Sequence, residues 1–155
     1  MISPEALRKF PFFSFLAGDL FDKIAMLADE VTWEADEIVF EIRKNADYLF
    51  LLGTGEIELH YMVKDELISE KSKEFFIGSI NIGEAFGLSS LIEPYEYTSV
   101  AVASQASTGV RINAIKLRKL AGEDPHLGFE LMKQVAKASF ERLSSVRVEL
   151  AAARS

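Results

Sequence analysis

Residues 83–100 read GEAFGLSSLIEPYEYTSV, and this stretch decides how the rest of the chain is interpreted. Gly83 and Gly87 flank an aromatic residue, and paired serines, a short apolar run and a Glu-Pro break then lead into the strand-like TSVAVA. Glycine adopts backbone conformations that other residues avoid, and proline interrupts a strand ladder. The stretch therefore predicts a glycine-started turn and one turn of helix between two strands.

The residues on both sides of this turn have the pattern of β strands. Between residues 31 and 113, segments rich in β-branched and aromatic residues, such as YLFLLGTGEIELHYMV, are separated by glycines and polar turns. Residues 64–74, KDELISEKSKE, are polar and charged, which is typical of an exposed hairpin loop. Several short strands with turns at modest spacing predict a sandwich or a rolled-up barrel.

Helices are expected at both ends of the strand region. Ser3 before Pro4 has the pattern of a helix N-cap, and so does Asp124 before Pro125, while Gly122 has the pattern of a helix end. We therefore expect a mainly β protein with flanking helices. The expected order, within one domain covering residues 1–155, is N-terminal helices at 3–30, a β-roll at 31–113, a short helix at 114–122 and a long helix at 124–152.

The long C-terminal helix carries two apolar stripes. In the first stripe the residues are spaced by three and four positions, as in a coiled-coil seam, and Ser139 is the one weak position. This stripe contains Met132, Val135, Ser139, Leu143, Val146 and Leu150. The other stripe, on a different side, contains Phe129, Ala136 and Phe140. We interpret one stripe as packing on the strands and the other as binding a second copy of the chain, which predicts a homodimer. A single broad stripe facing the core is the alternative.

Composition and charge argue against several classes of function. The chain carries 24 acidic and 17 basic residues, a formal net charge of −7, which argues against general nucleic-acid binding. It has no cysteine, and His60 and His126 fall in different predicted elements, so we expect neither a metal site nor an enzyme. No apolar run approaches the ~20 residues that cross a bilayer, and Pro11 interrupts a short signal-like stretch. We therefore expect a cytoplasmic protein without a membrane segment.

The order of these elements and several sequence segments resemble the cyclic-nucleotide-binding domains of the cyclic AMP receptor protein and FNR type. The matching segments, within residues 7–150, are LRKFPFFSFLAGDLFDKIA, WEADEIVFEI, YLFLLGTGEIEL, IGEAFGLSSLIEPYEYTSVAVA and DPHLGFELMKQVAKASFERL. The resemblance implies a double-stranded β-helix, a jelly-roll-like β-roll, with a phosphate-binding cassette at residues 86–99. It also implies a cyclic nucleotide as a possible ligand and no other cofactor. The implied ligand-binding residues are Phe86, Gly87, Leu88, Ser89, Ser90, Tyr97, Thr98 and Arg142.

Two positions depart from the family pattern. Where the family has a Glu that accepts the ribose 2′-hydroxyl, this chain has Leu88, and where an Arg clamps the phosphate, it has Tyr97. Arginine supplies a charge and a bidentate fork that tyrosine lacks, and losing such a buried charge partner costs about 2–5 kcal/mol. We therefore do not expect an ordinary site for cyclic AMP or cyclic GMP. Arg142, on the part of the long helix that meets the ligand in the family, is the candidate for a partial replacement.

Two functions follow from these observations. The first is a non-enzymatic regulatory module that binds a small anionic, nucleotide-like ligand in the cassette and relays binding through the C-terminal helix. The second is a ligand-free structural or dimerisation domain that kept the fold and lost nucleotide binding. Transcription factors of the family carry a helix-turn-helix after the long helix, whereas this chain stops at AAARS, so we expect no direct DNA binding.

Overall fold

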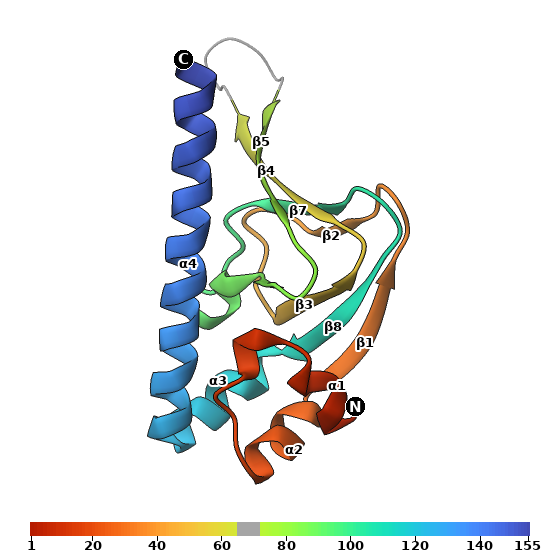
Figure 1. Cartoon of the computed structure of the whole chain (residues 1–155), viewed down its shortest axis with the longest axis vertical. Coiled ribbons are helices and arrows are strands. Elements are labelled where there is room, and N and C mark those ends of the chain that lie inside the picture. The colour runs from red at the N-terminus through yellow and green to blue at the C-terminus, as the bar shows by residue number, and fades with distance from the viewer. Residues whose placement is uncertain (65–71) are drawn as a thin grey trace.

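Two antiparallel β sheets and a long C-terminal helix dominate the architecture (Figure 1). The computed structural model describes residues 1–64 and 72–155. Most of the hairpin loop expected at residues 64–74 lies outside these described residues.

The strands of the described part of the chain form two sheets of four strands each. The first sheet contains, in order across it, β1 (Ala28–Trp33), β8 (Ser107–Asn113), β3 (Tyr48–Thr54) and β6 (Ala85–Phe86). The second contains β2 (Ile38–Phe40), β7 (Val100–Ala103), β4 (Ile57–Lys64) and β5 (Ser72–Ile80). Because β8 pairs antiparallel with both β1 and β3, strands far apart in the chain are neighbours in space. This arrangement is the jelly-roll-like β-roll that we expected.

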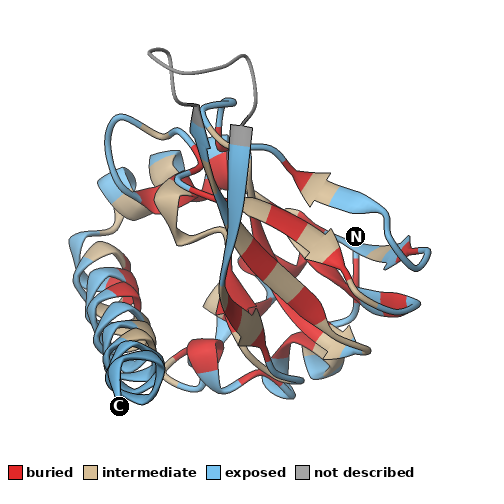
Figure 2. Ribbon diagram, turned by 90° about the horizontal axis from the view of Figure 1, so that it is seen from above, coloured by how far each residue is buried: buried red, intermediate tan, exposed pale blue. Residues whose placement is uncertain are grey.

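Strand β3 is buried on both faces. Successive side chains of a strand point to opposite faces, so Phe50 and Leu52 belong to the core between the sheets, and Leu49 and Leu51 belong to a second core that the helices cover. Figure 2 shows the resulting bands of buried residues along the strands. Burial on both faces explains why the sequence of this strand is a continuous apolar run rather than an alternating one.

The N-terminal helices are shorter than the sequence indicates. They are α1 (Pro4–Arg8), η1 (Pro11–Phe13) and α2 (Asp19–Ala25). The Ser3 side chain caps α1 by accepting a hydrogen bond from the Ala6 N–H at 3.2 Å. Helical spacing predicted helix as far as residue 30, but β1 begins at Ala28, which pairs with Ile112 of β8. Here the pairing with a distant strand outweighs the local helical pattern. The residues after the end of α2 have no helical hydrogen-bond partners, and pairing with β8 supplies partners for their backbone N–H and C=O groups.

Both C-terminal helices begin after a side-chain cap, as predicted for Asp124. They are α3 (Ala114–Glu123) and α4 (Pro125–Arg154). Asn113 accepts a hydrogen bond from the Lys116 N–H (3.0 Å), and Asp124 accepts one from the Leu127 N–H (3.2 Å). Gly122 lies inside the last turn of α3 rather than after it, and α4 runs two residues beyond its predicted end. Within the described ranges, none of the helices is both long enough and apolar enough to cross a membrane.

The two sides of α4 differ from the predicted stripes. Leu127, Leu131 and Val135 are buried in the helix-covered core. Apolar side chains on the opposite side are exposed, and we call them the outer stripe: Phe129, Met132, Ala136 and Phe140. Figure 2, which looks along α4, shows buried residues on the side of the helix that faces the sheets. The residues of the predicted coiled-coil seam differ in burial, since Val135 is buried in the core while Met132 is exposed.

Candidate functional site

A cavity of about 450 Å³ lies between the second sheet, the turn at Gly87 and α4. The turn continues into η2 (Leu88–Leu91), a short 3-10 helix. Seven of the residues predicted as ligand-binding line this one cavity: Phe86, Gly87, Leu88, Ser89, Tyr97, Thr98 and Arg142. The structure thus brings together residues that lie up to 56 positions apart, since 142 − 86 = 56.

Gly87 contributes to the wall of the cavity, and its position requires glycine. Its φ of 73° is left-handed, and an added Cβ would lie 3.2 Å from the Phe50 ring, 3.3 Å from the Tyr48 carbonyl oxygen and 3.4 Å from the Tyr97 ring. Both the conformation and the lack of space favour glycine at this position. The turn then closes through a hydrogen bond from the Ser90 N–H to the Gly87 carbonyl oxygen (3.1 Å).

Tyr97 occupies the position that the family resemblance assigns to a charged clamp. Its ring stacks on Phe40 with centroids 3.9 Å apart and planes 8° from parallel, and the residue is 6% exposed. Its hydroxyl donates to the Tyr48 carbonyl oxygen (2.8 Å), and its oxygen accepts from the Tyr48 N–H (3.3 Å). Burial raises the pKa of Tyr97 to about 12, so the phenol is neutral at physiological pH. Tyr97 is therefore a packed, hydrogen-bonded wall residue without a charge to offer an anion.

The Tyr97→Phe variant tests this account of the site. It is expected to lower the free energy of unfolding by about 1 kcal/mol, because the bond to the Tyr48 carbonyl is lost. The folded-state pKa lies above the ordinary value near 10, so the native protein keeps a proton that the unfolded chain releases, and stability falls as pH rises from about 10 to about 12. Denaturant unfolding across this range should show a shallower decline for Tyr97→Phe than for the wild type. The exposed Tyr61→Phe is the control and should keep the wild-type decline; equal declines in all three proteins would contradict the account.

Arg142 brings a positive charge to the cavity from the opposite side. It lines the cavity from α4, and its Nη1 atom would lie 3.3 Å from a Cβ added at Gly78 of β5. Gly78 adjoins a β-bulge, where Leu59 of β4 pairs with Gly78 and His60 with Phe76. Burial lowers the pKa of the Arg142 guanidinium, and the charges of Glu84 and Glu149 raise it. Within the described ranges, no carboxylate lies within 4.0 Å of this guanidinium.

Hydroxyl groups reach the cavity at its cassette end. Ser89, Thr98 and Ser99 line it, whereas Ser90 is fully buried outside the lining. The Ser90 carbonyl accepts a hydrogen bond from Arg118 of α3 (2.6 Å), whose guanidinium also lies 3.8 Å from the centre of the Tyr95 ring. Ser90 therefore joins the turn to α3 rather than facing a ligand in the cavity.

Several lining residues were not predicted as ligand-binding. They are Phe40, Leu59, Ile77, Ile80, Ala85, Ile92, Ser99, Val135, Ser139, Leu143 and Val146. The α4 members follow one helix face at steps of four, three and four through Arg142, which is a signal that the sequence contains. Val135, Ser139, Leu143 and Val146 belong to the stripe that the sequence predicts as a coiled-coil seam. The lining residues on the strands could not be predicted from the sequence, because the position of the second sheet relative to α4 decides which of them face the cavity.

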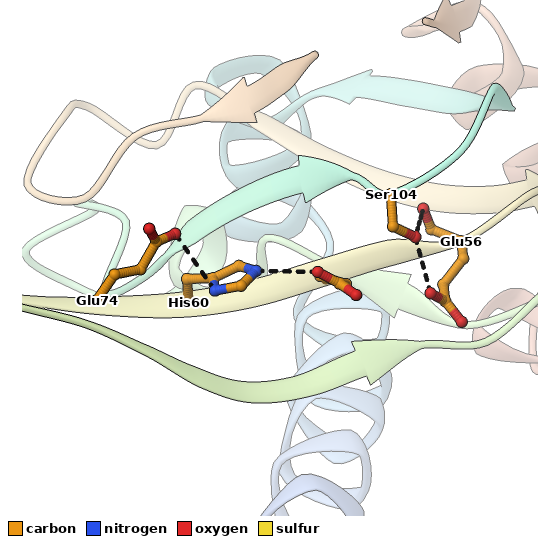
Figure 3. A network of polar contacts seen from close by, with 5 residues as sticks. Glu56, His60, Glu74 and Ser104 are labelled. Atoms are coloured by element: carbon orange, nitrogen blue, oxygen red, sulfur yellow. Dashed lines mark hydrogen bonds and ion pairs between the residues drawn. The ribbon is translucent and has the colours of Figure 1, made fainter. Parts of the chain in front are cut away.

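The polar cluster on β4 lies outside the cavity. Figure 3 shows His60 beside Glu74, with Nδ1 3.3 Å from the Glu74 carboxylate. The Nε2 atom of His60 lies 3.1 Å from the Glu58 carboxylate. Ser104 donates to the Glu56 carboxylate at 2.7 Å at the start of the same strand. In the described residues, no group of three or more His, Cys, Asp or Glu side chains is arranged to hold a metal ion. His60 thus holds the outer surface of the β4–β5 pair together.

Comparisons with known proteins point to one family. The family described as "Cyclic nucleotide-binding domain" matches residues 30–124. The chain is 36% identical to a candidate cyclic nucleotide-binding protein of Geobacter metallireducens GS-15, with a TM-score of 0.80 over 92% of this chain and 99% of that one. No curated protein matches the sequence significantly.

Two more distant structures share the fold. The catabolite activator protein of Thermus thermophilus is 20% identical, with a TM-score of 0.66 over 93% of this chain and 63% of that one. The regulatory domain of Toxoplasma gondii PKA, solved with cAMP, is 11% identical, with a TM-score of 0.69 over 86% of this chain and 48% of that one. At these identities the likeness concerns the fold alone.

Proposed function

The chain belongs to the cyclic nucleotide-binding domain family, and on that premise we propose that it is a non-enzymatic regulatory module that senses a small anionic ligand. The observation that carries the proposal is the single cavity shared by the Gly87 turn and α4. A molecule bound there would contact the turn and the helix at once. Binding energy could then change how the helix packs against the rest of the domain.

The relay would act on the second half of α4. The first half is fixed, because Leu127, Leu131 and Val135 are buried in the core. Ser139, Arg142 and Val146 line the cavity instead, and the helix continues beyond them as an extended rod (Figure 1). A ligand that binds one packing of this half more tightly than another shifts the population between the two.

The output surface that we propose is the outer stripe of α4. Phe129 is 62% exposed and Phe140 is 72% exposed, although both are large apolar side chains. Their repetition along one helix face is typical of a helix that packs on another helix. We propose that a second copy of the chain covers the stripe, so that ligand-dependent packing of α4 alters a homodimer.

A ligand-free structural domain is the second candidate. The ring of Tyr97 stacks on Phe40, and its hydroxyl is already hydrogen-bonded to Tyr48. This favours the structural domain, because an uncharged side chain without a free hydrogen-bonding group stands where the family has a charged arginine. In that case the outer stripe would act in dimerisation without any signal from the cavity.

Thermal unfolding and hydrogen exchange with added nucleotides separate the two candidates. The trial ligands are cyclic AMP, cyclic GMP and cyclic dinucleotides at millimolar concentration, with AMP as the non-cyclic control. A ligand at 100 times its Kd stabilises the folded protein by about 2.7 kcal/mol. The sensing proposal expects slower amide exchange over residues 139–146 with any ligand that binds. Stabilisation without any change of exchange in this segment would contradict the relay. Failure of all of these nucleotides to stabilise the protein would exclude them as ligands.

A further inference from the structure

The chemistry of the cavity narrows the class of ligand. Most of its wall is apolar, with side chains such as Leu59, Ile80, Leu143 and Val146. The polar part consists of a few hydroxyl groups and Arg142, and among the described residues no acidic side chain lines the cavity. We infer that the ligand is a small carboxylic acid with an apolar body, whose carboxylate binds the Arg142 guanidinium. This inference rests on the proposed sensing function and names the ligand of that same cavity.

A cyclic nucleotide fits this wall poorly. It carries ribose hydroxyl groups and base nitrogens along its whole length, and each one buried without a partner costs affinity. Leu88 and Tyr97 stand at the cassette end, where a sugar-phosphate would need an acceptor and a charge. The hydroxyls of Ser89, Thr98 and Ser99 supply neither a positive charge nor a carboxylate.

The charge of the cavity is located on α4. Arg142 is partly buried and has no carboxylate within 4.0 Å in the described residues, although Glu84 lines a smaller hollow of about 280 Å³ that Arg142 also borders. Gly78 leaves room for the guanidinium against β5, since an added Cβ would lie 3.3 Å from Nη1. A planar guanidinium binds a planar carboxylate through two parallel hydrogen bonds. A partly desolvated arginine without a close partner therefore favours a ligand that brings one carboxylate.

The volume of the cavity and its apolar wall indicate the size and the chemistry of the ligand beyond its carboxylate. A cavity of about 450 Å³ lies in the lower part of the range of small-molecule sites, which is about 300–1,000 Å³. An aryl or medium-chain alkyl group would cover the apolar wall near Ile80 and Val146 without burying further polar groups. The expected ligand class is thus an arylalkanoic or medium-chain fatty acid, and 4-phenylbutyrate and octanoate represent its two forms.

Calorimetric titration with 4-phenylbutyrate and octanoate tests the inference. Both acids should bind the wild type at millimolar concentration or below, and the neutral 4-phenylbutyramide should bind about 10- to 100-fold more weakly than its acid. Arg142→Gln should lose affinity for the acids by a similar factor, and Arg142→Lys, which keeps the charge but not the fork, should lose less. Arg147→Gln is the matched control, because Arg147 is an exposed arginine on the same helix that does not line the cavity. It should bind as the wild type does.

The remaining outcomes separate this inference from the proposed function. Binding of cyclic AMP or cyclic GMP without binding of the acids would overturn the inference and leave the sensing function in place. Equal affinity for the acid and its amide would overturn the inference even if Arg142→Gln did not fold, since this comparison needs no variant. Failure of every acid and nucleotide to bind would overturn the inference and favour the ligand-free structural domain.

Discussion

Replacing Gly55 with alanine is expected to destabilise the β-roll by about 3 kcal/mol or more. Gly55 lies between β3 and β4, where the chain passes from one sheet to the other, and its φ is 92°. An added Cβ would overlap Ser107 Oγ and lie 2.7 Å from the Ala106 carbonyl oxygen. The strained conformation and the overpacking each cost about 1–3 kcal/mol, and the clash also disturbs the bond from the Glu56 N–H to Ser107 Oγ (3.1 Å).

Thermal and denaturant unfolding of the Gly55→Ala variant measure this loss. For a domain of this size, 3 kcal/mol corresponds to a fall in Tm of about 6–12 °C. Gly122→Ala is the control, because Gly122 lies in helix α3 with no atom within 4 Å of an added Cβ. This control is expected to be neutral or to stabilise by up to about 1 kcal/mol, as alanine favours helix over glycine. A Gly55→Ala protein that melts within about 2 °C of the wild type would show that the turn tolerates a side chain.

Replacing both Met132 and Phe140 with glutamate is expected to convert a dimer into a monomer. Both side chains belong to the outer stripe and neither lines the cavity. In a two-fold dimer each substitution occurs twice, so four carboxylates would enter one apolar interface. The loss of apolar burial and the desolvation of these charges should weaken dimerisation at least about 1,000-fold.

Analytical ultracentrifugation gives the readout. The wild type should sediment at twice 17.3 kDa and the double variant at 17.3 kDa. Val148→Glu is the matched control, since Val148 is 70% exposed on the same helix but lies about a third of a turn away from the outer stripe. It should remain dimeric. A wild type that is monomeric at high concentration, or a double variant that stays dimeric, would mean that a second copy does not cover the stripe.

Much of the fold could be predicted because its signals are local. The apolar run of β3 indicates a strand, and the cap residues Ser3 and Asp124 each indicate the start of a helix, in both cases from a few neighbouring residues. The start of β1 at Ala28 could not be predicted in this way, because it depends on the pairing with Ile112, 84 residues further along the chain (112 − 28 = 84). Helical spacing near Leu27 therefore extended the expected helix too far.

Most of the residues predicted as ligand-binding line one cavity, although Ser90 does not. Gly87, Leu88 and Tyr97 all line the cavity, as the family pattern implied. Ser90 does not, because the single turn of η2 points neighbouring serines in different directions, and only the structure gives that rotation. The two faces of α4 show the same difficulty. The helical spacing of apolar residues predicts both stripes. Only the packing of α4 against the rest of the domain shows that Val135 is buried and Phe140 is exposed.

The space for Arg142 had no sequence signal of its own. It depends on Gly78, since an added Cβ there would lie 3.3 Å from Arg142 Nη1, and Gly78 adjoins the register shift between Leu59 and His60. A glycine in a strand often marks such a bulge or a close approach, but the strand alone does not name the group that approaches.

Amide chemical shifts recorded by NMR during a titration with 4-phenylbutyrate test the central claim most directly. We predict that residues 87–99 and residues 139–146 shift together, with one saturation curve, because the ligand contacts the turn and α4 in the same cavity. Shifts confined to the separate hollow of about 590 Å³ that borders Lys9 and Thr108, or shifts in the turn without any in α4, would contradict the claim.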